Sequence, residues 1–320
     1  MDTFIGTIVS LSAGLTFLWY LVCVVCLIQS VKEGVTFALL TSQGICDLFA
    51  LLQYFVFGLE ICFEWQLFSL PPKWQSLMYS LLEYVALPHY VVIAANRATA
   101  VFAPIRVGEI WTLRRTVRIS LLMWITAITS ITLLHIFSDD NEIGFYVNVP
   151  SRYLLGARVN EMLARTFFEA FILGSKIACF TISVALYSAT IIRSSYVLRK
   201  TRRIHTSTAT LASSPGLSME SRLTAICLSN FLPSLIQVIL AMSWTDTNKY
   251  TNFVFTMLGI LDHSIDSFAL PAFSTVIRSR FQNLPYKIIG LLGFKRIMNI
   301  HKTHSMDSNH LSNLAVQGPI

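Results

Sequence analysis

A few charged side chains interrupt the long apolar stretches of this sequence. Arg97 follows Asn96 in the segment AANRATAVFAPI, and Lys176 is a second basic residue within an apolar run. A charge without a partner is costly in apolar surroundings, so residues of this kind are by default candidate functional sites. The acidic residues in comparable positions are Asp47, Glu83, Glu169, Asp262 and Asp266.

These residues do not form a pattern typical of an enzyme or of a metal centre. The sequence contains neither an HExxH nor a GxSxG motif,. Its six cysteines lack metal-ligand spacing, and most of them lie inside apolar runs, where a thiol behaves as a small hydrophobe,. We therefore expect no enzymatic activity and no firm metal site.

The apolar stretches that position these charges are typical of membrane spans. Of the residues, 54% are hydrophobic and 13% charged, whereas soluble domains carry about 25% charged residues. A bilayer core needs about 20 apolar residues in a row. We expect an all-α membrane protein, a seven-transmembrane helix bundle with spans near 5–28, 34–59, 75–103, 117–137, 166–192, 221–244 and 251–276.

The basic residues predict the direction of the spans. Of the 24 Lys and Arg residues, 17 lie in the connections 29–33, 104–118 and 193–222 and in the tail from 277, against 5 in the other connections. The positive-inside rule therefore predicts an N-terminus outside and a C-terminus inside. Topology also accounts for the net charge of +7, so we expect no nucleic-acid partner.

The chain beyond the last span is expected to remain on the cytoplasmic side. Residues from about 286 to 300 mix apolar and basic side chains, which predicts a short amphipathic helix on the membrane surface,. We assign 1–302 to one seven-transmembrane receptor domain and 303–320 to a disordered cytoplasmic tail. The segment 205–218 has the composition of a flexible linker within the third inner loop,.

Six residues with particular places in these spans carry a resemblance. They are Asp47 in the second span, Arg97 at the inner end of the third, Pro104 seven residues later, Trp124 in the fourth, and Pro233 and Pro271 within the sixth and seventh. Together they resemble the landmarks of rhodopsin-like G-protein-coupled receptors. In those receptors an acidic-Arg-aromatic triplet ends the third span, and prolines kink the sixth and seventh.

The chain departs from the rhodopsin-like pattern at several positions. Asn96 replaces the acidic residue of the triplet and Ala98 the aromatic one. Phe231 stands two residues before Pro233, where those receptors have Trp. The segment 138–165 contains no cysteine, so the usual disulfide to the second outer loop cannot form, and the fold of that loop stays open.

Two segments resemble a subgroup more closely. NRATAVFAPIRVGEIW, 96–111, and DSFALPAFSTVIRSRF, 266–281, are similar to nematode serpentine chemoreceptors, above all to their gamma and v classes. The resemblance implies a G-protein-coupled chemosensory receptor of the plasma membrane, with the sensory cilium as a candidate compartment. Its implied partners are a small-molecule ligand, a heterotrimeric G protein and the lipid bilayer. The implied activation residues are Asn96, Arg97, Pro104, Phe231, Pro233 and Pro271.

The buried charges have competing interpretations. Lys176 either contacts the ligand or forms a structural pair with Glu83 or Glu169, and Arg97 is either the switch residue or an anchor that extends to the interface. For the ligand pocket, in the outer half of the bundle, we select Tyr79, Glu83, Glu169 and Lys176.

Asp47 has two interpretations of its own. The resemblance implies a sodium ion near its carboxylate, helped by Asp262 or Asp266. A structural hydrogen-bond hub is the alternative. We expect no other cofactor.

Two other classes of membrane protein were weighed. A seven-span transporter or channel without G-protein coupling stays the alternative, although such proteins have paired inverted repeats and broken helices, which are not apparent in this sequence. An opsin needs a lysine in the seventh span, and there is none from Thr251 to Ile277.

Overall fold

We analysed a computed structural model of the chain. It describes residues 2–65, 72–137, 146–149, 151, 153–157, 167–205, 224, 232–236, 239 and 248–291. The chain divides into two compact units, Met1–Ile277 and Arg278–Ile320. The side-chain contacts that build the candidate site lie within the first unit.

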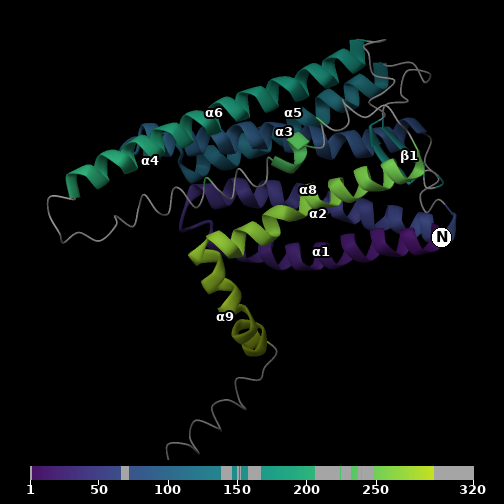
Figure 1. The fold of residues 1–320 in the computed structure, drawn as a ribbon, viewed down its shortest axis with the longest axis horizontal. Coiled ribbons are helices and arrows are strands. Elements are labelled where there is room, and N and C mark those ends of the chain that lie inside the picture. Colours follow the sequence, from purple (N-terminus) through teal and green to yellow (C-terminus); the bar gives the residue numbers. More distant parts are fainter. Residues whose placement is uncertain are drawn as a thin grey trace, which may run out of the picture. The chain divides into compact units, whose positions relative to one another are not determined.

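Long helices make up most of the described chain (Figure 1). In chain order they are α1 (Asp2–Ser30), α2 (Val35–Phe63), α3 (Pro72–Phe102), the short α4 (Val107–Ile110), α5 (Leu113–Phe137), α6 (Phe167–His205), α8 (Lys249–Phe273) and α9 (Thr275–Leu291). Two short strands, β1 (Tyr146–Val149) and β2 (Leu154–Ala157), form an antiparallel hairpin with Tyr146 opposite Ala157 and Val149 opposite Leu154.

Within the described residues, six helices are long and apolar enough to cross a membrane. They contain the expected spans 1 to 5 and 7, as stretches of α1, α2, α3, α5, α6 and α8. The expected sixth span, 221–244, lies mostly outside the described residues, although 232–236 are helical.

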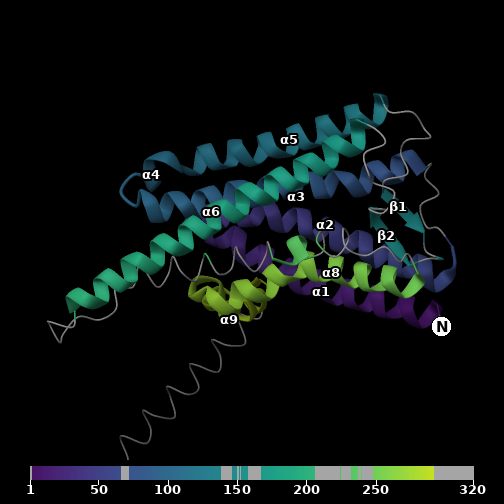
Figure 2. The same cartoon turned by 45° about the horizontal axis from the view of Figure 1, so that its top comes forward.

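The packing of the helices follows from their sequence (Figure 2). α1 lies along α2, α3 packs against α2, α5 and α6, and α8 packs against α1 and α2. α1 and α2 approach closely at Gly58, where an added Cβ would lie only 2.5 Å from the Ser10 nitrogen. Small residues at such a crossing let two backbones come into contact, which is how helices associate in lipid.

The outer surface of the bundle is apolar, while several polar residues are buried. Gln43, Asp47 and His89 are at most 1% exposed. In a soluble domain this distribution would be reversed, so it fits a bundle surrounded by lipid tails. The exposed large hydrophobic residues on α1 and α5 include Leu11, Leu15, Leu18, Leu121, Leu122 and Ile125.

Two boundaries differ from the sequence-based expectation. α6 does not end near residue 192 but continues to His205, because the basic stretch after the apolar span has neither Gly nor Pro to end a helix,. The helix after the seventh span begins at Thr275 instead of about 286. Ser274 interrupts α8 with an extended backbone, and its hydroxyl accepts from the Ile277 amide, which caps the new helix,. α9 is described to Leu291, and the expected tail 303–320 lies outside the described residues.

Candidate functional site

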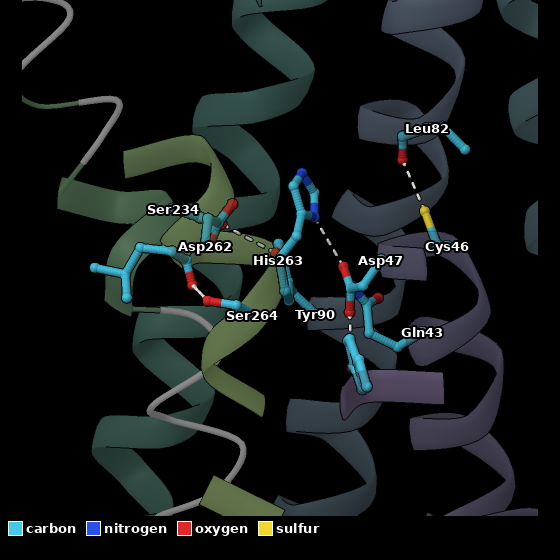
Figure 3. Close-up of polar contacts among 11 residues, drawn as sticks. Gln43, Cys46, Asp47, Leu82, Tyr90, Ser234, Asp262, His263 and Ser264 are labelled. Carbon is cyan, nitrogen blue, oxygen red and sulfur yellow. Dashed lines mark hydrogen bonds and ion pairs between the residues drawn. The ribbon is translucent and has the colours of Figure 1, made fainter. Parts of the chain in front are cut away.

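The Asp47 carboxylate is the centre of a polar network between α1, α2 and α8 (Figure 3). Its side chain is almost completely buried, with 1% of the residue exposed. The Tyr20 hydroxyl donates to Oδ2 over 3.0 Å, and His263 Nδ1 lies 2.9 Å from Oδ1. Gln43, one helical turn earlier on α2, donates its amide to the same carboxylate at 3.2 Å. Both oxygens therefore have donors from the protein.

A second network surrounds Asp262, the residue next to His263 on α8. The Ser234 hydroxyl lies 2.6 and 2.7 Å from the two Asp262 oxygens and donates to this carboxylate. The Tyr90 hydroxyl lies 3.0 Å from Ser234 Oγ. Successive helical residues point about 100° apart. His263 thus links α8 to α2 and, through Asp47, to α1. Asp262 links α8 to the 232–236 segment and, through Ser234, to α3.

The Asp47 network has the form of a hydrogen-bond hub. Both carboxylate oxygens accept from protein donors, Tyr20 and Gln43 among them, and His263 Nδ1 lies beside Oδ1. In the part of the chain that the structure describes, no three His, Cys, Asp or Glu residues could hold a metal ion together. Asp266 is buried on α8. The sodium ion near Asp47 stays a prediction.

Arg97 is buried near the end of α3. It is 4% exposed and Asn96 is 2% exposed. Its Nη2 donates to Thr36 Oγ1 on α2 and, at 2.6 Å, to Asn96 Oδ1. Thr36 Oγ1 also donates to Asn96 Oδ1 at 2.9 Å. The guanidinium is therefore held in part by neutral oxygens of α2 and α3, and its role as switch residue or interfacial anchor stays a prediction.

Two of the four residues selected for the ligand pocket meet between α3 and α6. Lys176 forms an ion pair with Glu83 and is 7% exposed, whereas a third of the Glu83 side chain is exposed. Beside this pair, the Tyr84 hydroxyl lies 3.2 Å from Ser175 Oγ. Lys176 and Glu83 are thus paired, and whether the pair is structural or contacts the ligand stays a prediction. The side chains of the other two, Tyr79 and Glu169, lie outside the described residues.

The three prolines of the expected switch have different surroundings. Pro104 is exposed in the turn that follows α3, as its place after Arg97 predicted. Pro233 is buried in the helical segment 232–236, next to Ser234 of the Asp262 network. Pro271 lies inside α8 just before its end. Phe231 lies outside the described residues.

Several polar partners were not selected from the sequence. Thr36, Tyr20 and Ser234 complete the networks around the charged residues, and Ser42 lies between Trp124 Nε1 (3.0 Å) and His89 Nε2 (2.8 Å). Hydroxyl residues are common in membrane spans, so residue type alone does not single these out. Gln43 could have been found, because residues four apart lie on the same helical face as Asp47.

The helices and the site define a multi-pass helical membrane protein with a polar core. The chain matches the family model described as serpentine type 7TM GPCR chemoreceptor Srv over residues 10–283, and it belongs to this family. The match confirms the seven-transmembrane class and the resemblance to the v-class serpentine receptors. The family is a class of chemoreceptors rather than of enzymes. A search of curated proteins found no match.

Proposed function

We propose that this chain is a chemosensory receptor of the plasma membrane, with the sensory cilium as its compartment. A small molecule binds in the outer half of the bundle, and a heterotrimeric G protein is activated on the inner side. Membership of the Srv chemoreceptor family carries this proposal. The buried, hydrogen-bonded Arg97 at the predicted inner end of α3 supports the coupling step.

The ligand acts by differential affinity for two helix arrangements, since a ligand that binds both equally well shifts nothing. The Glu83–Lys176 pair is our candidate contact in the outer half. An anionic group competes with Glu83 for the Lys176 ammonium, and a cationic group competes for the more exposed Glu83. Either exchange changes how α3 is tied to α6.

The polar core transmits this change toward the inner end. Asp47 and Asp262 join five packed segments, α1, α2, α3, 232–236 and α8, through short hydrogen bonds. Such networks have discrete arrangements because each buried polar group needs a partner. A shift of the segment around Pro233, where the ring removes a backbone hydrogen bond, exchanges the Ser234 partners and leaves α8 free to move,.

At the inner end, the last step is the release of Arg97. In the described arrangement its guanidinium is directed to Thr36 and Asn96 and is inaccessible to a protein partner. Separation of α2 from α3 exposes it for the G protein. Both of these described acceptor oxygens, on Thr36 and Asn96, are neutral.

The coupling step is tested with Arg97→Ala in cells that express the full chain and a G protein. A panel of volatile and pheromone-like small molecules supplies the stimulus, and intracellular calcium is the readout. We expect the variant to lose responses by more than about tenfold at wild-type surface levels, because a charge-assisted contact of 1.5–3 kcal/mol is removed.

Arg106→Ala is the matched control, since Arg106 is an exposed arginine in the turn after α3. We expect it to retain responses. Undiminished responses of Arg97→Ala would refute its role in coupling. Substrate flux or current without any G protein would favour the seven-span transporter or channel instead.

A further inference from the structure

Tyr153 occupies an unusual position for a loop residue. It lies in the turn between β1 and β2, in the connection that the charge pattern assigns to the outer side, yet it is 0% exposed. Its φ of 55° is in the left-handed region, which side chains other than Gly, Asn and Asp rarely adopt,. A residue keeps this conformation only when the contacts around it hold it there.

Three residues from distant parts of the chain meet here. The Tyr153 hydroxyl donates to Asp2 Oδ1 at the start of α1. Lys249, the first residue of α8, donates to both Asp2 oxygens at 2.9 and 2.7 Å, and its ammonium lies 4.4 Å from the centre of the Tyr153 ring. We call Asp2, Tyr153 and Lys249 the outer latch.

Two further contacts fix the latch to α8. Thr256, two turns after Lys249, donates its hydroxyl to the Tyr153 carbonyl at 2.9 Å. The Asn248 side chain accepts from the Tyr250 and Thr251 amides and so caps the helix where Lys249 begins it,. Burial raises the pKa of the Tyr153 phenol, so the hydroxyl keeps the proton that it donates to Asp2.

The hairpin that carries Tyr153 spans two helices. β1 packs against α3 and β2 against α8, at the end of the bundle where the chain begins (Figure 2). With Tyr153 held on Asp2, the hairpin also reaches α1. No cysteine is available between 138 and 165 to fasten it covalently. The described contacts from Tyr153 to α1 and α8 are hydrogen bonds and are therefore reversible.

We propose that the β1–β2 hairpin is a lid over the predicted outer end of the bundle and that the Asp2–Tyr153–Lys249 latch holds it closed in place of a disulfide. About a third of the Asp2 and Lys249 side chains is exposed. An ion pair with this exposure is weak and screened by salt. A hairpin of two four-residue strands does not hold its position alone,. The lid therefore opens when the latch breaks. The lid and its latch do not depend on the proposed function. Only the entry of a small-molecule ligand beneath the lid rests on it.

The test measures access to a cysteine beneath the lid, in the full chain in intact cells. Asn252→Cys is the reporter, because Asn252 is 6% exposed and lies one turn before Thr256, so the bond from Thr256 to the Tyr153 carbonyl is kept. Cys62, which is partly exposed, is replaced by Ser, and the parent without Asn252→Cys gives the background. The probe is a charged, membrane-impermeant methanethiosulfonate added outside.

We expect slow labelling with the latch intact and labelling about fivefold faster with Lys249→Gln, from the loss of an exposed ion pair and a cation–π contact. The rate rises with added salt only when the latch is intact. The exchange Asp2→Lys with Lys249→Asp restores protection, which a merely destabilised bundle would not do. Tyr250→Phe, at the exposed neighbour of Lys249, leaves the rate unchanged.

Equal labelling rates with and without Lys249→Gln would overturn the proposal, as would fast labelling with the latch intact. If Asn252→Cys does not reach the surface, Thr256→Cys replaces it as reporter, one turn later on α8 and 1% exposed, and all rates are then compared within that background. The measurement needs neither ligand nor G protein. Its failure is therefore distinguishable from a failure of the proposed receptor function.

Discussion

Arg97 carries a full charge in a buried position, and an amide oxygen and a hydroxyl share in holding it. A buried guanidinium is stable only with well-placed acceptors, because desolvation costs several kcal/mol. Neutral acceptors offset less of this cost than a carboxylate does. The resting position of Arg97 is therefore sensitive to the loss of one oxygen.

Thr36→Val removes that oxygen while it keeps the volume of the side chain. We expect ligand-independent signalling to rise by about tenfold, since a hydrogen bond to a charged group contributes about 1.5–3 kcal/mol. Basal calcium or guanine-nucleotide exchange at matched surface levels measures this.

Thr41→Val is the control on the same helix, because the Thr41 hydroxyl donates to the Phe37 carbonyl of its own helix. An increase that is equal in both variants, or absent from Thr36→Val, would contradict a role of Thr36 in holding Arg97.

Sequence patterns identified the charged members of the networks but not their partners. Asp47, Glu83, Arg97 and Lys176 stand out because charges are rare in apolar runs. Which hydroxyl lies beside which charge depends on helix rotation and separation, which the sequence does not define. The latch escaped notice for the same reason, since Asp2 and Lys249 are 247 residues apart.

Among the elements, α1 and α2 approach each other backbone to backbone at a glycine. At Gly58 an added methyl group meets backbone of α1, which cannot move aside as a side chain does. A larger residue at this position would force the two helices apart and weaken their packing along their length.

Gly58→Ala should therefore destabilise the protein by about 1–3 kcal/mol, the usual cost of overpacking. Thermal unfolding of the detergent-purified protein would show a lower apparent Tm. Gly174→Ala on α6 is the control, because an added Cβ there has nothing within 4 Å, and Ala favours a helix more than Gly does,. A Tm of Gly58→Ala equal to or above that of Gly174→Ala would exclude a close crossing.

Element boundaries were predictable where lipid determines them. The apolar runs predicted where α1, α2, α3, α5, α6 and α8 cross. The basic end of α6 and the early start of α9 were not predicted. An apolar run marks only the part of a helix that lies in lipid, whereas the helical hydrogen bonds continue beyond it. The hairpin was missed because strands of four residues leave little periodicity,.

For the whole molecule, orientation rests on the distribution of basic residues. The segments assigned to the outer side are consistent among themselves, since Asp2, Tyr153 and Lys249 are in contact. Contact alone does not tell which end of the bundle faces outside. The distribution of Lys and Arg among the connections predicts this orientation.

Epitope tags at the two ends test this orientation. A tag before Met1 should be stained on intact cells, and a tag after Ile320 only once the cells are permeabilised. The opposite staining pattern would invert the topology and place the latch in the cytosol.

The length of α6 has a mechanical consequence. Its 39 residues extend about 58 Å, nearly twice the hydrocarbon thickness of about 30 Å,. A rigid rod of this length works as a lever. A tilt of about 5° around its predicted outer end displaces its basic tip by about 5 Å, so a small rearrangement beside Lys176 becomes a larger displacement at the predicted inner end,.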